Sequence, residues 1–93
     1  MDIKTIQTIV SKVAEEYPVK KIILFGSWAN NTNREDSDVD LIIEFSTPVS
    51  LLMLSRVRLR LEESLQLNVD VVHGPLRAGD LLVIDKVVEL YEA

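Results

Sequence analysis

Two aspartates separated by one residue stand next to an apolar segment, and this spacing suggests metal chemistry. Asp38 and Asp40 end a polar loop and lead into the apolar run Leu41-Ile42-Ile43. Side chains alternate between the faces of a strand, so residues two apart point the same way with a spacing of about 6.5 to 7 Å. Two such carboxylates can converge on one divalent cation or on a close pair. Hard oxygen ligands suit Mg²⁺, which takes few protein carboxylates together with waters and substrate phosphates.

A second polar element, Gly26-Ser27, directly follows the apolar segment Val19 to Phe25. Gly26 has no Cβ, which lets an anion approach the main chain. The next residues, 28–30, can form one helical turn with Ser27 near its N-cap. Free backbone N–H groups and a hydroxyl at such a helix start bind phosphate. A phosphate cradle beside a Mg²⁺ carboxylate pair predicts a nucleoside triphosphate site.

The elements that must position these residues follow from the hydrophobic pattern. Residues 2–17 carry apolar side chains at spacings of three and four, which predicts an amphipathic helix with Asp2 as N-cap and Pro18 as the stop. Short apolar runs predict strands at 19–25, 38–45 and 67–73. Two further helices are predicted, one from the N-cap Thr47 and Pro48 to Leu65, and a last one from Gly79 or Asp80 to Tyr91.

This order of elements predicts an α/β (α+β) fold in one domain covering residues 1–93. The first two strands are joined by a loop that permits an antiparallel pair. The helix before the third strand permits a parallel crossover, right-handed by the usual rule. We therefore expect a small mixed sheet of three or more strands, with helices packed mainly on one side.

Two apolar features each allow two interpretations. The helix ending at Leu65 is apolar around much of its circumference, so Leu51, Met53 and Leu54 either contact another chain or extend the core of this one. A homo-oligomer or a hetero-oligomer would follow from the first interpretation. Trp28 either stacks on a base or contacts a partner, or its ring covers the end of the sheet.

Composition excludes several classes of protein. The 93 residues contain 15 acidic and 10 basic side chains, for a formal charge of −5, and no cysteine. Proteins that bind DNA or RNA present a basic surface, so we expect no direct nucleic-acid binding. The absence of cysteine rules out disulfides and zinc–thiolate sites. No secretory signal is present and no apolar run approaches the roughly 20 residues of a membrane span, so we expect a cytoplasmic protein.

The pattern Gly26-Ser27-x-Ala29, then Arg34, then Asp36-Ser37-Asp38-x-Asp40-Leu41 resembles the signature of the DNA polymerase β-type nucleotidyltransferase superfamily. The short chain is similar to the minimal nucleotidyltransferase (MNT) branch, whose members are often antitoxins in HEPN–MNT toxin–antitoxin pairs. One departure is visible after Ala29, where the family commonly has Arg-Gly and this chain has Asn30-Asn31. Asn31 tolerates the left-handed conformation of a glycine. Arg34 is the remaining candidate for the phosphate contact of the missing arginine.

The resemblance implies a polymerase β-like fold and a role for each motif residue. Asp38 and Asp40, with Asp70 as the third carboxylate, would be the catalytic residues and hold two Mg²⁺ ions, and Asp70 would also help deprotonate the acceptor. ATP would be bound by Gly26, Ser27 and Arg34. Asp70 lies in a β-branched run, where a buried carboxylate is costly unless it is paired or metal-bound.

The implied reaction is transfer of AMP from ATP to a hydroxyl, expected to be a tyrosine, of a helical HEPN toxin, which is thereby neutralised. Because the chain has no second domain to bind an acceptor, a separate protein is expected to supply it. Two alternatives stay open: a non-catalytic antitoxin that sequesters its partner, and a subunit of a small-molecule nucleotidyltransferase.

Overall fold

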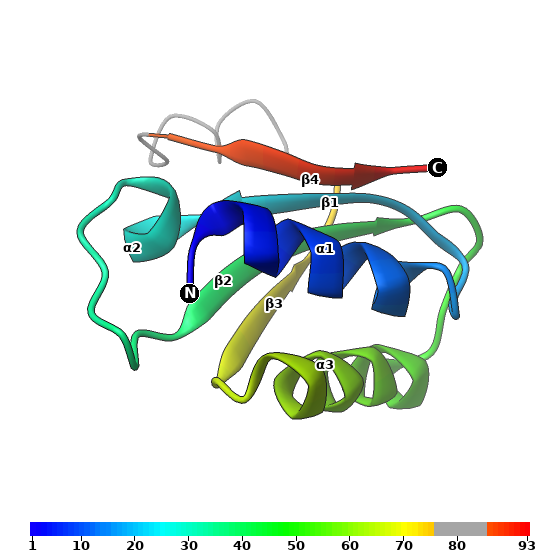
Figure 1. Cartoon of the computed structure of the whole chain (residues 1–93). Coiled ribbons are helices and arrows are strands. Elements are labelled where there is room, and N and C mark those ends of the chain that lie inside the picture. Colours follow the sequence, from blue (N-terminus) through cyan, green and yellow to red (C-terminus); the bar gives the residue numbers. More distant parts are fainter. Residues whose placement is uncertain (76–85) are drawn as a thin grey trace.

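The computed structural model describes residues 1–75 and 86–93, which build a four-stranded sheet with two long helices against one face (Figure 1). The elements, in chain order, are α1 (Ile3–Ala14), β1 (Val19–Phe25), α2 (Gly26–Ala29), β2 (Val39–Phe45), α3 (Leu51–Leu65), β3 (Val69–His73) and β4 (Val88–Glu92). The sheet order is β3-β2-β1-β4. β1 is antiparallel to β2 and β4, whereas β2 and β3 are parallel, so the predicted mixed sheet and crossover are confirmed.

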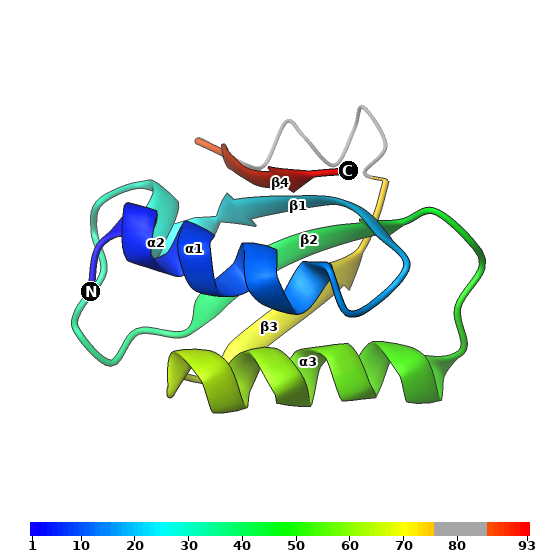
Figure 2. The same ribbon diagram turned by 45° about the vertical axis from the view of Figure 1, so that its right-hand side comes forward.

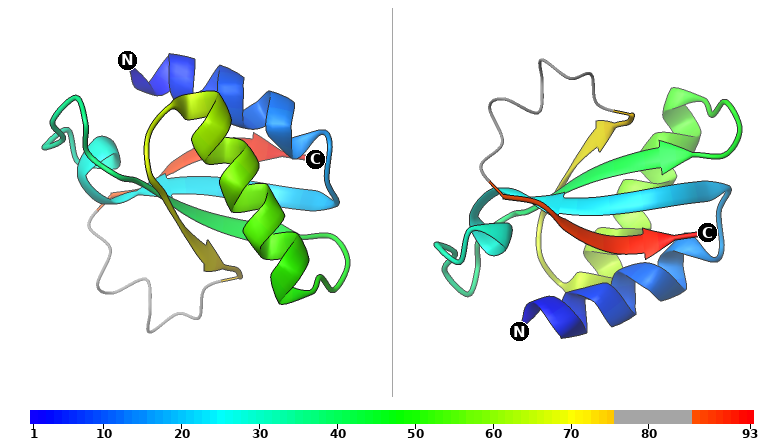
Figure 3. Two further views of the ribbon diagram at one scale, coloured as in Figure 1. Left: turned by 90° about the horizontal axis from the view of Figure 1, so that it is seen from below. Right: turned by 90° about the horizontal axis from the view of Figure 1, so that it is seen from above.

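α1 and α3 cover the same face of the sheet, as the predicted one-sided packing requires (Figures 1 and 2). Viewed from below, α3 lies across the strands (Figure 3). The core forms between these helices and the central strands, where Ile22 pairs with Ile43 and Leu24 with Leu41. All four side chains are fully buried. Burial of so much apolar surface on one face is the main force that holds the sheet in register.

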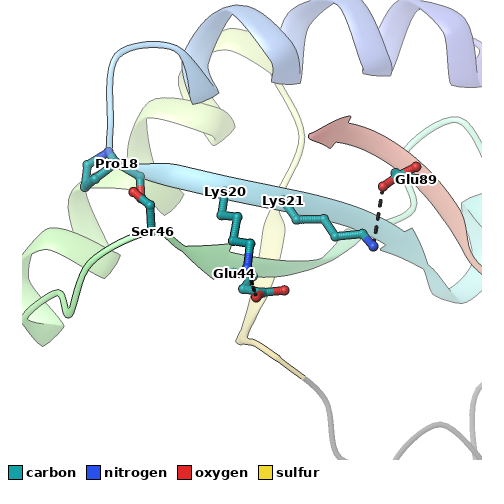
Figure 4. Close-up of polar contacts among 6 residues, drawn as sticks. All are labelled: Pro18, Lys20, Lys21, Glu44, Ser46 and Glu89. Carbon is teal, nitrogen blue, oxygen red and sulfur yellow. Dashed lines mark hydrogen bonds and ion pairs between the residues drawn. The ribbon is translucent and has the colours of Figure 1, made fainter. Parts of the chain in front are cut away.

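The sheet face opposite the helices carries charged side chains. Lys21 of β1 forms an ion pair with Glu89 of β4 at 3.4 Å, and Lys20 pairs with Glu44 of β2 at the same distance (Figure 4). Ser46, the residue after β2, joins the end of this strand to the start of β1, because its N–H and hydroxyl both donate to Pro18 O. These exposed pairs contribute little stability each, and their main effect is to keep this face polar.

The predicted caps are partly confirmed. Asp2 is the N-cap of α1, and its Oδ1 accepts from Thr5 N at 2.8 Å. The prediction for α3 was wrong: Ser50, not Thr47, is its N-cap, with Oγ accepting from Met53 N at 3.1 Å. Pro48 therefore lies before the helix. A serine cap that bonds the third residue of the helix outweighs the preference of proline for the first turn.

The predicted last helix was wrong over its described part. Residues 88–92 form strand β4, which pairs with β1 from Leu24 to Lys21, and residues 76–85 lie outside the described residues. Val88 and Tyr91 are residues that favour strands, and Leu90 is buried in the core. The spacing of the apolar residues fits a helix as well as a strand, and pairing with β1 makes this segment a strand. Within the described ranges, no helix combines the length and apolarity that crossing a bilayer requires.

Candidate active site

The turn from β1 into α2 brings Gly26 directly onto the carboxylate of Asp40. Gly26 has φ +75°, a conformation that other residues rarely adopt. Phe25, the residue before it, is the register partner of Asp40 on β2. A Cβ at position 26 would occupy the space of Asp40 Oδ2 and come within 3.0 Å of its Cγ. Glycine is therefore required twice, for the backbone conformation and for the close approach of Asp40.

The helical turn after β1 begins two residues earlier than predicted. α2 starts at Gly26, so Ser27 is its second residue rather than a residue near its N-cap, and Phe25 occupies the N-cap position. Phe25 provides no side-chain hydrogen bond to the first turn. Asn30 N donates to Gly26 O at 3.0 Å and Thr32 N donates to Ser27 O at 2.9 Å, which fixes the turn from its far end. The backbone N–H groups at its start are thus not capped by the preceding side chain.

The loop between α2 and β2 is held by Trp28. Its ring is only 4% exposed, and its Nε1 donates to Ser37 O at 3.0 Å. Ser37 Oγ in turn accepts from Arg34 N at 2.7 Å. Burial favours the interpretation in which the ring covers the end of the sheet. Asn31 adopts φ 59°, as its replacement of a glycine predicts. The Arg34 side chain is exposed.

Of the three predicted site aspartates, Asp40 and Asp70 are paired on neighbouring strands, whereas Asp38 lies before its strand. Asp40 and Asp70 are register partners on the parallel strands β2 and β3, and both point to the sheet face opposite the helices. Asp38 stands one residue before β2 and is exposed. Asp70 is not a buried carboxylate, because its strand is at the edge of the described sheet and its side chain is exposed. Residues 1–75 and 86–93 contain no group of three or more His, Cys, Asp or Glu side chains arranged to hold a metal ion.

The pKa of Asp40 reflects its partial burial and the carboxylates near it. Partial burial raises the pKa of Asp40 above its ordinary value of 3.8, and the charge of Asp70 and a hydrogen bond to it act in the same direction, followed by the charge of Asp38. Asp40 and Asp70, which face each other across β2 and β3, form a pair of anionic oxygen donors. Such a pair suits a hard divalent cation such as Mg²⁺, which takes few protein carboxylates and completes its shell with waters and phosphates.

One residue that sequence reasoning missed is Glu62 of α3. Its Oε2 accepts from Val69 N at 2.9 Å, and its Oε1 accepts from Arg58 Nη1, also at 2.9 Å. Val69 is the first residue of β3 and precedes Asp70. From the sequence, Glu62 reads as one of several charges interleaved along a helix. No local pattern signals a contact between residues seven apart across a turn.

The arrangement suits chemistry on a phosphate ester. A turn whose first N–H groups receive no hydrogen bond from the preceding side chain follows β1, and a carboxylate pair lies on the neighbouring strands β2 and β3. The family comparison agrees with this description, because the model of the family described as "Nucleotidyltransferase domain" matches residues 6–91. The chain belongs to this family, within the minimal nucleotidyltransferase branch, and it is related to the protein adenylyltransferase MntA.

Its relatives in sequence are protein adenylyltransferases. The protein adenylyltransferase MntA of Thermococcus cleftensis is 38% identical over 80 residues, which cover 84% of this chain and 81% of the relative. A Methanocaldococcus jannaschii protein provisionally named a protein adenylyltransferase is 39% identical over 61 residues. That alignment covers 66% of this chain and 62% of the relative's length.

Solved structures share the fold at low sequence identity. A toxin–antitoxin complex with AMP-PNP contains a chain with a TM-score of 0.77 and 19% identity, and the match covers 94% of this chain and 73% of that one. A complex of a tri-AMPylated HEPN toxin with an MNT antitoxin from Shewanella oneidensis gives a TM-score of 0.71 at 16% identity, covering 97% and 72%. These likenesses confirm the predicted polymerase β-like fold.

Proposed function

We propose that this chain transfers AMP from ATP to a hydroxyl group of a HEPN-type partner and thereby acts as its antitoxin. The observation that carries the proposal is the position of Asp40, which lies between the Gly26 turn on one side and Asp70 on the other. The MntA relative is named as a protein adenylyltransferase, and in the solved complex a tri-AMPylated HEPN toxin is bound to an MNT antitoxin that shares the fold of this chain.

The site divides into two halves with different tasks. The nucleotide half consists of Gly26, Ser27 and Asp40, with Arg34 near its loop. The acceptor half is Asp70 on β3. In the nucleotide half, the free N–H groups at the start of α2 and the Ser27 hydroxyl bind the β- and γ-phosphates. The exposed Arg34 follows this turn and provides a cation for the same phosphates. It replaces the arginine that the family commonly has at the position of Asn30.

In the reaction, the acceptor oxygen forms a bond to the α-phosphorus, and the bond from this phosphorus to the bridging oxygen of pyrophosphate breaks. Asp70 accepts or orients the proton of the acceptor hydroxyl, which we propose belongs to a tyrosine. Mg²⁺ bound by Asp38, Asp40 and Asp70 would neutralise charge on the phosphates and lower the pKa of that hydroxyl. The acceptor half is exposed, so a large partner can reach it.

The direct test is co-expression of this chain with a HEPN-type partner protein, followed by mass spectrometry of the intact partner. We expect the wild-type chain to add one or more AMP moieties to a tyrosine, and the addition to depend on Mg²⁺. Asp70→Asn should add none. If the wild-type chain neutralises its partner without changing the partner's mass, the adenylyltransferase proposal is wrong and the chain is a sequestering antitoxin.

A further inference from the structure

The connection between α3 and β3 is short and closed by one side chain. Only residues 66–68 separate the two elements, and Gln66 adopts the left-handed conformation with φ 58°. Glu62 bonds to both sides of this turn. Its backbone carbonyl accepts from Gln66 N at 2.8 Å, and its carboxylate accepts from Val69 N at 2.9 Å. A single residue of the last helical turns thus sets where β3 begins.

The hydrogen bond to Val69 is made on the outer edge of the sheet. Asn68 O accepts from Val39 N at 2.9 Å, so Asn68 faces β2. Backbone groups alternate in direction along a parallel strand, which turns the N–H of Val69 away from β2. No strand pairs with β3 on that side among the described residues. The Glu62 carboxylate takes the place of a neighbouring strand at this position, and bonds to a charged acceptor are stronger than neutral ones.

We propose that Glu62 is a positioning residue for AMP transfer: it holds the first residue of β3 so that the next residue, Asp70, faces Asp40. The inference rests on the proposed function, and it explains how an exposed edge strand can hold a reacting group in place. The Glu62 side chain is 22% exposed, and Arg58 bonds its other oxygen and fixes its rotamer. A misplacement of about 1 Å at a reacting group can lower a rate about 100-fold.

Substitutions can separate the hydrogen bond from the ion pair. Glu62→Leu removes both, whereas Glu62→Gln keeps an oxygen that accepts from Val69 N. Arg58→Met removes only the ion pair. Glu63→Leu is the matched control, because it removes an exposed glutamate from the next position of the same helix.

With a HEPN-type partner protein and Mg²⁺–ATP, we expect Glu62→Leu to lower kcat about 10- to 100-fold and leave ATP affinity unchanged. Glu62→Gln should restore most of kcat. Arg58→Met and Glu63→Leu should stay near wild type. Backbone hydrogen exchange supplies a readout independent of turnover, because the amide of Val69 should lose protection in Glu62→Leu and keep it in the other three variants.

Three results would overturn the inference: wild-type kcat in Glu62→Leu, failure of Glu62→Gln to restore activity, or equal loss of kcat and ATP affinity, which would indicate general unfolding. If the wild-type chain transfers no AMP at all, the proposed function fails instead. The positioning of β3 is then decided by exchange at Val69 and by the NMR resonances of Asp70, which should shift in Glu62→Leu and not in Glu63→Leu.

Discussion

The nucleotide half and the acceptor half of the site are built in opposite ways. Gly26 and Asp40 lie against each other at the end of the two central strands, where Val39 and Leu41 on either side of Asp40 are fully buried and the carboxylate occupies the place of a Cβ at position 26. Asp70 stands on a five-residue edge strand and is exposed. The first half is fixed by core packing and by a required backbone conformation. The second depends on a few hydrogen bonds at the start of β3.

This difference matches the tasks of the two halves. A triphosphate is small and always the same, so a rigid turn can be shaped for it in advance. The acceptor belongs to another protein and must approach from outside, which requires an exposed group. A substitution at the tightly packed Gly26 should therefore change stability and ATP binding together, whereas one at the exposed Asp70 should change turnover alone.

The largest effect is expected from Gly26→Ala. The added Cβ would overlap Asp40 Oδ2, and the φ of +75° disfavours any residue with a side chain. We expect a loss of about 2 to 4 kcal/mol in the free energy of unfolding, together with loss of ATP binding. Urea denaturation and ATP titration measure both. Ser27→Ala is the control, since it should weaken ATP binding and leave stability nearly unchanged; equal stability of Gly26→Ala and wild type would contradict the packing.

The second prediction concerns the acceptor half. Asp70→Asn should lower AMP transfer at least about 100-fold, because the acceptor hydroxyl loses the group that takes its proton. ATP binding should persist, and the free energy of unfolding should change by less than about 0.5 kcal/mol, since the side chain is exposed. Rate measurements with the partner and calorimetry with ATP alone make the distinction. Loss of ATP binding in this variant would show that the two halves are not separate.

An intermediate effect is expected from Trp28→Phe, which keeps the ring and removes the donor to Ser37 O. The carbonyl that loses its partner costs about 1 to 2 kcal/mol. Because Ser37 precedes Asp38, affinity for Mg²⁺–ATP should fall as well. Thermal unfolding and ATP titration report the two quantities. Unchanged affinity beside lowered stability would mean that the loop does not need this bond to place Asp38.

The smallest effect is a pH-dependent gain in stability from Asp40→Asn. The raised pKa of Asp40 means that its ionised form is disfavoured in the fold. Wild type therefore loses stability as the pH rises above 3.8, the ordinary value, until the raised pKa is passed, and the variant does not. Allowing for solvent screening, the variant should gain less than about 1 kcal/mol at pH 7 and nothing at pH 3.

Urea denaturation at pH 3 and pH 7 without divalent cations checks this prediction, with Asp36→Asn, an exposed loop carboxylate, as the control. Added Mg²⁺ should stabilise wild type and not the Asp40 variant. A gain that is the same at both pH values would assign it to packing rather than to charge.

Local signals were sufficient for most of the fold. The strand Val19–Phe25 was predicted with its bounds, and the Asp2 cap and the left-handed Asn31 follow from residue chemistry. Pairings between distant segments decided the rest. β4 is a strand because β1 is beside it, and its residues alone fit a helix equally well. Three hydroxyl residues precede α3, and the sequence does not show which of them is the N-cap. They are Ser46, Thr47 and Ser50.

The same division holds for the site. Asp38, Asp40 and Gly26-Ser27 are visible from spacing, since they lie within one strand–turn–strand segment. The exposure of Asp70 is set by the position of its strand in the sheet, which a β-branched run does not reveal. Glu62 is seven residues from the amide that it bonds, on a different element. Met53 is partly buried and packs against the core, as the interpretation of α3 as an extension of the core expects. Leu51 is 83% exposed, and its contact with another chain stays a prediction.

The place of Asp70 on the edge of the sheet has a consequence for solubility. Within the described residues, β3 pairs on one side only, and three of its residues, Val69, Val71 and Val72, are β-branched. An edge strand of this kind can pair with a second molecule, and a charged side chain on it, here Asp70 at its second residue, opposes that pairing. The substitution Asp70→Val would therefore promote aggregation even in a chain without transferase activity. We expect an inactive homologue to retain the aspartate because it opposes self-association.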